Sequence, residues 1–252
     1  PEVSSCLSAL YAIKASGNKP VFAPINDFNG NLQIEYVKKK FKKKDIDLII
    51  SPNLFGIKNK LDELIDLKVP IIEDCAQSFL SSTKKNKPLA DIQIYSFYPT
   101  KGFQSIDGGA ILYKDKKYKK IFENKIYYGG QKKVVNYNCY NYKMSNICAY
   151  LAYNEVKKHK VYEIKFNNIK KKYDKYLANK NIKLPKISQN EILSRYIIVL
   201  DKISLLNKIK NKISNKLQVN TELMRINNSK LKSQSSDYIM KRNLSLPYYL
   251  SL

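Results

Sequence analysis

The sequence contains no apolar run that approaches the length of a membrane span. Its first residues, Pro1–Ser4, lack the basic-then-apolar pattern of a secretion signal. These absences argue against a membrane protein and against a secreted one. The chain has 252 residues, of which 44% are hydrophobic, so we expect a soluble globular protein with one large domain or a large and a small domain. The simplest location for such a chain is the cytoplasm.

Cysteine and histidine are also scarce. The four cysteines, Cys6, Cys75, Cys139 and Cys148, show no CxxC spacing. This pattern favours reduced thiols over disulfides or a zinc site, so no metal is expected. The one histidine, His159, stands among lysines on an expected polar helix face, where we expect it to be solvated.

Acidic residues are few compared with basic ones: 21 Asp and Glu against 46 Lys and Arg, for a formal net charge of +25. Lysine runs such as 38–44 and 170–172 could neutralise the phosphates of a nucleic acid. The basic residues are spread along the whole chain, however, and are mostly lysines accompanied by many Asn and Ile residues, a mixture typical of AT-rich codon usage. This distribution favours a solvated lysine-rich surface over nucleic-acid binding, and such a surface would attract an anionic nucleotide-linked sugar.

Expected helices and strands alternate in the first half of the chain. The helices are expected at Leu7–Ala15, before Gly17, and at 38–44 and 61–67, and the strands at 20–23, 46–50, 71–72 and 92–95. This alternation predicts an α/β fold with a mainly parallel sheet and helices on both faces.

The C-terminal part of the sequence predicts a second, smaller domain. A strand is expected at 110–113, a long helical stretch from Ser145 to about Lys180, a strand at 192–200 and a helix at 203–217. We therefore expect a large domain over residues 1–150. A linking helix and a small C-terminal α/β domain would occupy residues 151–252.

Polar side chains follow two of the expected apolar strands. Asp74 comes after Ile71 and Ile72, and Ser96 with Lys101 follows the strand that ends near Tyr95. An open α/β sheet presents its chemistry outside the carboxyl ends of its strands. Pyridoxal phosphate (PLP) fits these residue types, because a lysine amine can hold its aldehyde as a Schiff base and an aspartate can pair with its pyridinium nitrogen. A serine near the lysine can take the phosphate.

Three motifs appear in order along this part of the chain. Glu73–Gln77 reads EDCAQ, Ser96–Phe97 is followed by Lys101, and Gly108–Gly109 opens a strand. The set resembles the DegT/DnrJ/StrS family of PLP-dependent sugar aminotransferases. Further matches to family patterns lie at 12–22, 54–56, 141–144 and 245–247.

The resemblance implies the aspartate-aminotransferase-like (type I) PLP fold. It also implies a homodimer with shared active sites that transfers an amino group, from glutamate, to a keto group of a nucleotide-diphosphate sugar for surface polysaccharide or glycan synthesis. Relatives carry an additional N-terminal segment and a final helix that are not visible in this sequence. The alternative is therefore a truncated, inactive relative that acts as a binding or assembly partner. Nucleic-acid binding rests on charge alone.

Four residues receive roles in the cofactor site by this resemblance. Lys101 would be the catalytic nucleophile and proton shuttle, unless it is one more surface lysine. Asp74 would pair with the ring nitrogen, or else cap a turn. Gln77 would contact the oxygen substituent of the ring, or else simply begin a helix. Ser96 would bind the phosphate, or else cap a turn.

Two further residues complete the implied set. Cys6 falls where relatives usually place an aromatic residue against the face of the ring. Asn141 resembles an asparagine that reaches the phosphate of the neighbouring subunit, although it could equally cap the helix that begins near Ser145. Lys143 replaces the usual arginine of that motif, so a bidentate contact made there would be lost.

Overall fold

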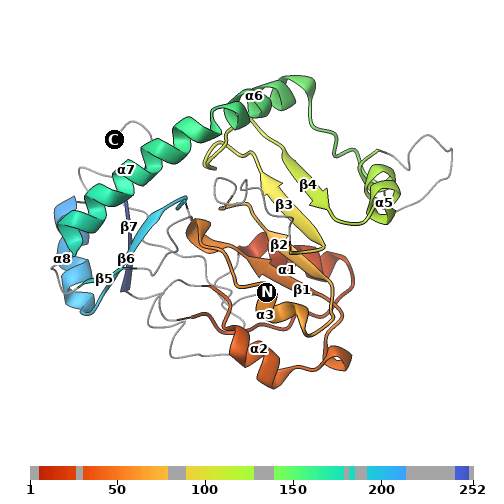
Figure 1. Ribbon diagram of the computed structural model, residues 1–252, viewed down its shortest axis with the longest axis horizontal. Coiled ribbons are helices and arrows are strands. Elements are labelled where there is room, and N and C mark those ends of the chain that lie inside the picture. The colour runs from red at the N-terminus through yellow and green to blue at the C-terminus, as the bar shows by residue number, and fades with distance from the viewer. Residues whose placement is uncertain are drawn as a thin grey trace.

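The computed structural model describes residues 6–26, 31–78, 89–127, 139–178, 182–184, 192–213 and 242–249 (Figure 1). The helices are α1 (Leu7–Ala15), α2 (Ile34–Lys40), α3 (Asp62–Ile65), α5 (Lys117–Ile126), α6 (Asn146–Lys157), α7 (His159–Leu177) and α8 (Ile203–Ile213), with short 3-10 helices η1 (Lys43–Asp45) and η2 (Leu54–Gly56). The strands are β1 (Ile49–Pro52), β2 (Ile71–Asp74), β3 (Ile92–Ser96), β4 (Gly109–Tyr113), β5 (Ile182–Lys183), β6 (Tyr196–Leu200) and β7 (Asn243–Leu246).

Strands β1 to β4 form one sheet in the order of the sequence. β1, β2 and β3 are parallel, with Ile72 opposite Ile50 on one side and Ile92 on the other. β4 runs antiparallel to β3, and Ile111 faces Ile94. This arrangement confirms the mainly parallel sheet that the alternation of helices and strands predicts.

The apolar side chains of this sheet divide between its two faces. Ile49 and Ile71 are buried in a core that also contains Val37 of α2 and Leu64 of α3. Side chains alternate across a strand, so Ile50 and Ile72 point to the opposite face, where both are only part-buried. The face that carries Ile50 is therefore less completely covered than the face packed on α2 and α3.

Helices α6 and α7 form a long arm that reaches from the four-stranded sheet to the three-stranded antiparallel sheet β5–β6–β7 (Figure 1). The helical stretch expected from Ser145 to about Lys180 is interrupted once, at Lys158, whose ψ of 4° lies outside the helical range. Its backbone N–H donates to the carbonyl of Glu155 and closes the first helix. The arm is thus two helices joined at one residue.

Hydrogen bonds from tyrosine hydroxyls join α7 to the three-stranded sheet and to the segment after it. Tyr196 donates to Asp174 Oδ1 (2.7 Å), and Tyr173 donates to a backbone carbonyl beyond β7 (2.8 Å). Tyr248 donates to the carbonyl of Phe166 (2.9 Å). Burial raises the pKa of Tyr196 and that of Tyr248, so both phenols stay neutral donors at physiological pH.

Turn η2 connects the larger sheet to the segment that leads into β6. The carbonyl of Phe55 accepts from the N–H of Ser194 (2.8 Å), and Gly56 has a φ of +88°. A Cβ on Gly56 would lie 2.5 Å from the carbonyl oxygen of Ile192 and 2.7 Å from the nitrogen of Ser194. Only glycine allows the two backbones to come this close.

Gly56→Ala is therefore expected to destabilise the protein by on the order of 3 kcal/mol, because it combines left-handed backbone strain with a clash against backbone atoms. Gly17→Ala is the matched control: Gly17 has a φ of +75°, but nothing lies within 4 Å of the added Cβ. We expect the control to lose only about 1 kcal/mol. Urea unfolding of both variants measures the difference, and equal losses would show that the close approach at Gly56 has no energetic role.

Three expectations in the first half of the chain need correction. The helix expected at 38–44 begins earlier and ends at Lys40, as α2, and Phe41 is extended. The strand expected at 20–23 does not form, because only Ala23 of that segment takes part in a bridge. The strand expected at 46–50 begins and ends later, as β1. The expected extension of α8 to residue 217 lies outside the described residues, and the domain boundary at residue 150 stays a prediction. Among the described residues, no helix is both long enough and apolar enough to cross a membrane.

Candidate active site

The carboxyl ends of β2 and β3 meet at one edge of the four-stranded sheet. β2 ends at Asp74, which stands opposite Ile94 of the parallel strand β3. β3 ends two residues further on at Ser96, which faces Gly109 at the start of β4. The sheet thus brings Asp74 and Ser96 to the same edge, as the sequence predicts.

Asp74 is a part-buried carboxylate with one backbone donor. Its Oδ1 accepts from the N–H of Ala76 (3.0 Å). Burial raises the pKa of Asp74, whereas the Ala76 hydrogen bond and the positive charge of Lys101 lower it by smaller amounts. Lys101 is therefore near enough to act electrostatically on Asp74, although 27 positions separate the two in the chain.

Lys101 lies in a loop that its own backbone and one aromatic ring hold in place. The backbone N–H of Lys101 donates to the carbonyl of Tyr98 (2.9 Å). The N–H of Ser105 donates to the carbonyl of Phe97 (2.7 Å) and closes the loop. Phe103, two residues after the lysine, is fully buried. The loop that carries the amine is thus anchored on both sides of Lys101.

The anchor of this loop is an aromatic cluster at the start of α7. The ring centroid of Phe103 lies 5.9 Å from that of His159 and 6.0 Å from that of Tyr162. The expectation of a solvated His159 is wrong, because its side chain is only 19% exposed. Apolar contact with Phe103 explains the burial.

The side chain of Ser96 accepts from the N–H of Tyr98 (3.4 Å), so the hydroxyl caps the turn that leads toward Lys101. This is the turn-capping alternative that the sequence left open. The bond uses the oxygen as an acceptor only, and the hydroxyl hydrogen can still be donated to an anion.

Gln77 is held by turn η2. Its Oε1 accepts from the N–H of Phe55 (3.0 Å), a residue with a φ of 58°. Sequence reasoning found both segments as separate motifs but did not predict that they bind each other. A contact of Gln77 with a ligand would therefore be made through its Nε2 donors.

The two remaining candidates lie at exposed positions. Cys6 is the residue before α1, and its carbonyl accepts from Ala9 N–H (3.1 Å). Asn141 pairs with Tyr127 in an isolated antiparallel bridge after α5. Within the described part of the chain, no hydrogen bond joins Cys6 or Asn141 to Asp74 or Lys101. The structure thus brings Asp74 and Ser96 to one sheet edge, with Lys101 in electrostatic reach of Asp74, and places Cys6 and Asn141 on other segments of the chain.

A close approach between the backbone and Met144 explains the glycine that precedes β4. Gly108 has a φ of +116°, and a Cβ there would lie 2.7 Å from the sulfur of Met144. Met144 directly precedes the cap of α6, whose Ser145 hydroxyl accepts from Cys148 N–H. Two motifs that lie 36 positions apart in the sequence are thus in contact beside the candidate site.

Sequence reasoning missed a buried polar network behind the site. Glu73 is 3% exposed and accepts from Asn53 Nδ2 (2.6 Å) and from Gln93 Nε2. The Tyr95 hydroxyl donates to Gln93 (2.9 Å). Side-chain alternation was the available signal, since Glu73 and Asp74 are neighbours in a strand and must point to opposite faces. Asp74 therefore reaches the candidate site, whereas Glu73 fixes β2 between its neighbouring strands.

Asn53→Ala is expected to destabilise the protein by about 2 kcal/mol, because the buried Glu73 carboxylate loses one of its two donors. Asn154→Ala is the matched control: Asn154 donates only to the carbonyl of Tyr150 on the exposed side of α6. Thermal unfolding followed by circular dichroism measures both changes. Equal melting temperatures for the two variants would contradict the importance of the network.

The sequence matches a known protein family over residues 4–252, the DegT/DnrJ/EryC1/StrS aminotransferase family. GDP-perosamine synthase of Escherichia coli O157:H7 is 26% identical over 155 residues, which cover 57% of this chain and 42% of that protein. A UDP-4-amino-4,6-dideoxy-N-acetyl-beta-L-altrosamine transaminase of Campylobacter jejuni is 27% identical over 157 residues, which cover 57% and 41%. The chain thus spans about two fifths of the length of these curated relatives.

Solved structures show the same fold. NtdA from Bacillus subtilis, crystallised with the cofactor PMP, aligns with 99% of this chain and 62% of its own, with a TM-score of 0.88 and 21% identity. PseC of Helicobacter pylori, an aminotransferase in pseudoaminic acid biosynthesis, aligns with 98% and 73%, with a TM-score of 0.85 and 17% identity. The PLP-form of Spr1654 from Streptococcus pneumoniae gives a TM-score of 0.82 at 19% identity, over 100% of this chain and 75% of its own. At such identities the likeness establishes the fold.

Proposed function

Because the chain belongs to the DegT/DnrJ/EryC1/StrS aminotransferase family, we propose that it binds PLP beside Asp74 and Lys101 and acts as a sugar aminotransferase. The amino group would come from glutamate and go to a keto group of a nucleotide-diphosphate sugar destined for surface polysaccharide or glycan. The names of relatives that act on GDP- and UDP-linked sugars support this substrate class. The observation that carries the proposal is the meeting of Asp74 and Ser96 at one sheet edge, with Lys101 on the loop that follows Ser96.

The residues at this edge fit the cofactor. Burial disfavours the charged form of Asp74, whereas the Ala76 hydrogen bond and the positive charge of Lys101 favour that form. A pyridinium N–H next to the carboxylate would be a further cation, so binding would relieve part of the burial cost. The Ser96 hydroxyl retains a hydrogen for the phosphate, and Lys101 lies on an anchored loop.

PLP, when bound, supplies an aldehyde and an electron-withdrawing ring. The amine of Lys101 would hold that aldehyde and, once released by substrate, carry a proton to and from the substrate carbon. Asp74 would keep the proton on the ring nitrogen. Ser96 would donate to the phosphate, and Gln77 would donate from Nε2 to the oxygen substituent of the ring.

Cys6 and Asn141 lie at exposed positions, which suits an active site that a second subunit helps to form. Cys6 would pack its sulfur against the face of the ring. Asn141 would reach the phosphate of a neighbouring subunit, which requires a homodimer with shared sites, and its exposed position leaves it accessible for such a contact. We also place the protein in the cytoplasm, where nucleotide sugars are made.

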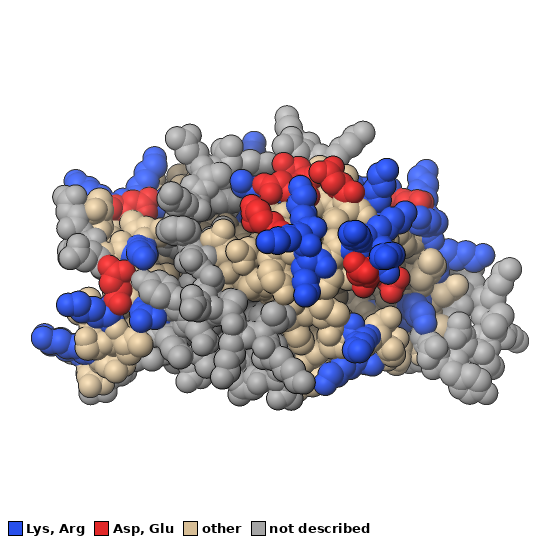
Figure 2. Space-filling view, turned by 90° about the horizontal axis from the view of Figure 1, so that it is seen from below, with Lys and Arg blue, Asp and Glu red and all other residues tan. Residues whose placement is uncertain are grey.

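Nucleic-acid binding is the weaker alternative. On the face shown in Figure 2, the lysine and arginine side chains of the described residues stand in separate groups with acidic side chains among them, and these described residues form no continuous stripe. Within the run 38–44, Lys38 lies 3.8 Å from Asp66. Dispersed and partly compensated charge predicts weak, salt-sensitive and sequence-independent binding to DNA.

The proposed function is tested by titrating the protein with PLP and recording the visible spectrum. We expect a saturable new band that borohydride removes, and peptide mapping after reduction should find the cofactor on Lys101 alone. Surface lysines also react with PLP, so Lys101→Arg, which keeps the charge, is the matched control and should remain unlabelled. A label scattered over many lysines would contradict the proposal and favour a relative that acts only as a binding or assembly partner.

A further inference from the structure

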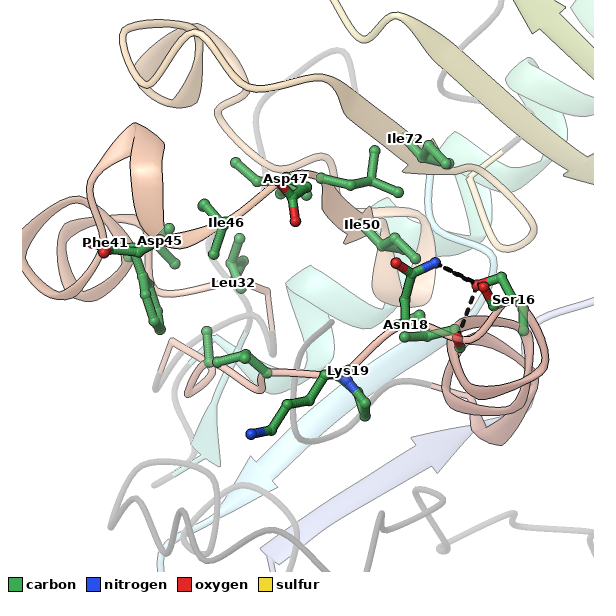
Figure 3. Close-up of a pocket in the computed structure, with 18 residues that line it drawn as sticks. Ser16, Asn18, Lys19, Leu32, Phe41, Asp45, Ile46, Asp47, Ile50 and Ile72 are labelled. Carbon is green, nitrogen blue, oxygen red and sulfur yellow. Dashed lines mark hydrogen bonds between the residues drawn. The ribbon is translucent and has the colours of Figure 1, made fainter.

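A cavity beside β1 and the break between α6 and α7 both lie outside the residues assigned to the candidate site. The cavity, of about 470 Å³, is lined mostly by aliphatic side chains of α1, the segment 18–23 and β1 (Figure 3). None of the described residues in its lining belongs to the loop that carries Lys101. The break between α6 and α7, in contrast, lies against that loop, because Phe103 packs on the first turn of α7.

One carboxylate joins the two helices across the break. Glu155 Oε1, in the last turn of α6, accepts from Lys158 Nζ (2.7 Å), and Glu155 Oε2 accepts from the hydroxyl of Tyr162 in the first turn of α7. Long side chains of a helix point toward its N-terminus, so the Tyr162 hydroxyl reaches back over Lys158. Both oxygens of Glu155 are thus held by donors that lie beyond the end of α6.

These groups keep their charges and protons at neutral pH. Burial raises the pKa of Glu155, but the hydrogen bonds from Lys158 and Tyr162 and the charge of Lys158 together lower it more, so the pKa lies below its ordinary value. Burial raises the pKa of Tyr162, and the hydrogen bond to Glu155 raises it further. A charged acceptor and a neutral phenol form a stronger hydrogen bond than two neutral groups do.

The loop that carries Lys101 is attached to both of these helices. Phe103 lies against the ring of Tyr162 in α7, with ring centroids 6.0 Å apart. The hydroxyl of Ser105 donates to the carbonyl of Cys148 in α6 (2.9 Å). The position of the loop therefore depends on the angle between α6 and α7.

A small change of that angle would move the loop by a chemically important distance. Cys148 lies ten positions before Lys158, or about 15 Å along the helix axis. A bend of about 5° at Lys158 would shift the attachment of Ser105 by about 1 Å relative to that of Phe103. A misplacement of about 1 Å at a reacting group can cost about two orders of magnitude in rate. A hydrogen bond that fixes the angle therefore affects the amine on the loop.

We propose that Glu155 is a positioning residue for Lys101. Its carboxylate fixes α6 relative to α7 through Lys158 and Tyr162, and the two helices fix the loop from which the amine of Lys101 acts. Glu155 would act only through these neighbours and would contact neither substrate nor cofactor. The chemistry of Lys101 rests on the proposed function, whereas the geometry of the loop does not.

The first test measures amide hydrogen exchange in the cofactor-free protein. The N–H groups of Lys101 and Ser105 close the loop, and we expect them to exchange about ten-fold faster in Glu155→Ala and in Tyr162→Phe. Glu155→Gln retains an oxygen that accepts from Tyr162, so it should restore the slow exchange. Tyr162→Phe keeps the ring and decides the question if Glu155→Ala does not fold.

Tyr173→Phe is the matched control. Tyr173 also lies in α7 and donates one hydroxyl hydrogen bond, to the carbonyl of Pro247 (2.8 Å). Its variant should lower the melting temperature about as much as Tyr162→Phe does, because each variant loses one hydrogen bond. It should leave the exchange of Lys101 and Ser105 unchanged.

The second test measures how fast PLP labels Lys101 when borohydride is added at intervals. Lys39, at an exposed position of the same molecule, is the internal reference. We expect labelling of Lys101 to be about ten-fold slower in Glu155→Ala and Tyr162→Phe, to recover in Glu155→Gln and to be unchanged in Tyr173→Phe. Labelling of Lys39 should be the same in all four variants.

Three outcomes would overturn the proposal. Unchanged exchange in both Glu155→Ala and Tyr162→Phe would show that the carboxylate does not hold the loop. Faster exchange with parental labelling of Lys101 would show that Glu155 serves stability alone. Equal effects of Tyr173→Phe would show a general loss of stability. A parent protein without label on Lys101 would overturn the proposed function instead, and the exchange rates would still decide whether Glu155 fixes the loop.

Discussion

Lys101→Ala is expected to lower amino transfer by about four orders of magnitude, because the variant loses both a nucleophile and a proton carrier. The fold should not change, since the buried side chain of Phe103, and not the part-buried side chain of Lys101, packs the loop against the protein. The measurement is the conversion of bound PLP to PMP by L-glutamate, followed by absorbance. This half of the reaction can be studied without knowing the sugar.

Two control variants separate chemistry from charge. Lys101→Arg keeps the positive charge that lowers the pKa of Asp74, but a guanidinium stays protonated and cannot act as the nucleophile. It should be as inactive as the alanine variant. Lys39→Ala, at an exposed position of α2, should convert PLP as the parent does. If either Lys101 variant converted PLP at the parental rate, Lys101 would not be the catalytic residue.

Asp74→Asn is expected to keep bound cofactor but to slow single-turnover conversion by about two orders of magnitude. An amide has no charge to hold the proton on the ring nitrogen, so the ring withdraws electrons less strongly. Mixing the PLP-loaded variant with L-glutamate and following the loss of the visible band measures the rate. A rate equal to that of the parent would mean that Asp74 is structural, with Ala76 as its main partner.

The pH dependence of stability gives Asp74 a second readout. Burial raises its pKa in the folded chain. The folded state therefore holds the proton more tightly than the unfolded state, and this contribution to stability is complete below the unfolded pKa of about 4 and is lost as pH rises through the folded pKa. At neutral pH, cofactor-free Asp74→Asn should melt no lower than the parent, and this relative advantage of the variant should disappear in acid. A lower melting temperature at neutral pH would show that the carboxylate supports the fold.

Much of the sheet could be predicted from the sequence because its strands carry isoleucines between the expected helices. Ile71–Asp74 (IIED) and Ile92–Ser96 (IQIYS) each contain two isoleucines, and each ends in the polar residue that marks the candidate site. Parallel pairing then places Asp74 and Ser96 at one edge without further information. The C-terminal end of α1 could also be predicted, because glycine favours the left-handed backbone conformation that Gly17 adopts after the helix.

The contacts that hold the site in place could not be predicted, because they join segments that are distant in the sequence. Nothing local to Gln77 indicates that its side chain binds Phe55, and nothing near Phe103 indicates that His159 and Tyr162 surround it. The strand expected at 20–23 failed for the same reason. Its apolar residues are suitable for a strand, but a strand also needs a neighbour with which to pair.

The adjacency of Glu73 and Asp74 would make binding of the proposed cofactor depend on the correct register of β2. A slip of β2 by one position would exchange the faces of the two acids, so that Glu73 would leave Asn53 and Gln93 while Asp74 would leave Lys101. A molecule misfolded in this way would lose its internal amide contacts and its cofactor partner in one event. The fraction of molecules that bind PLP in a refolded sample would then count those whose central strand has the correct register.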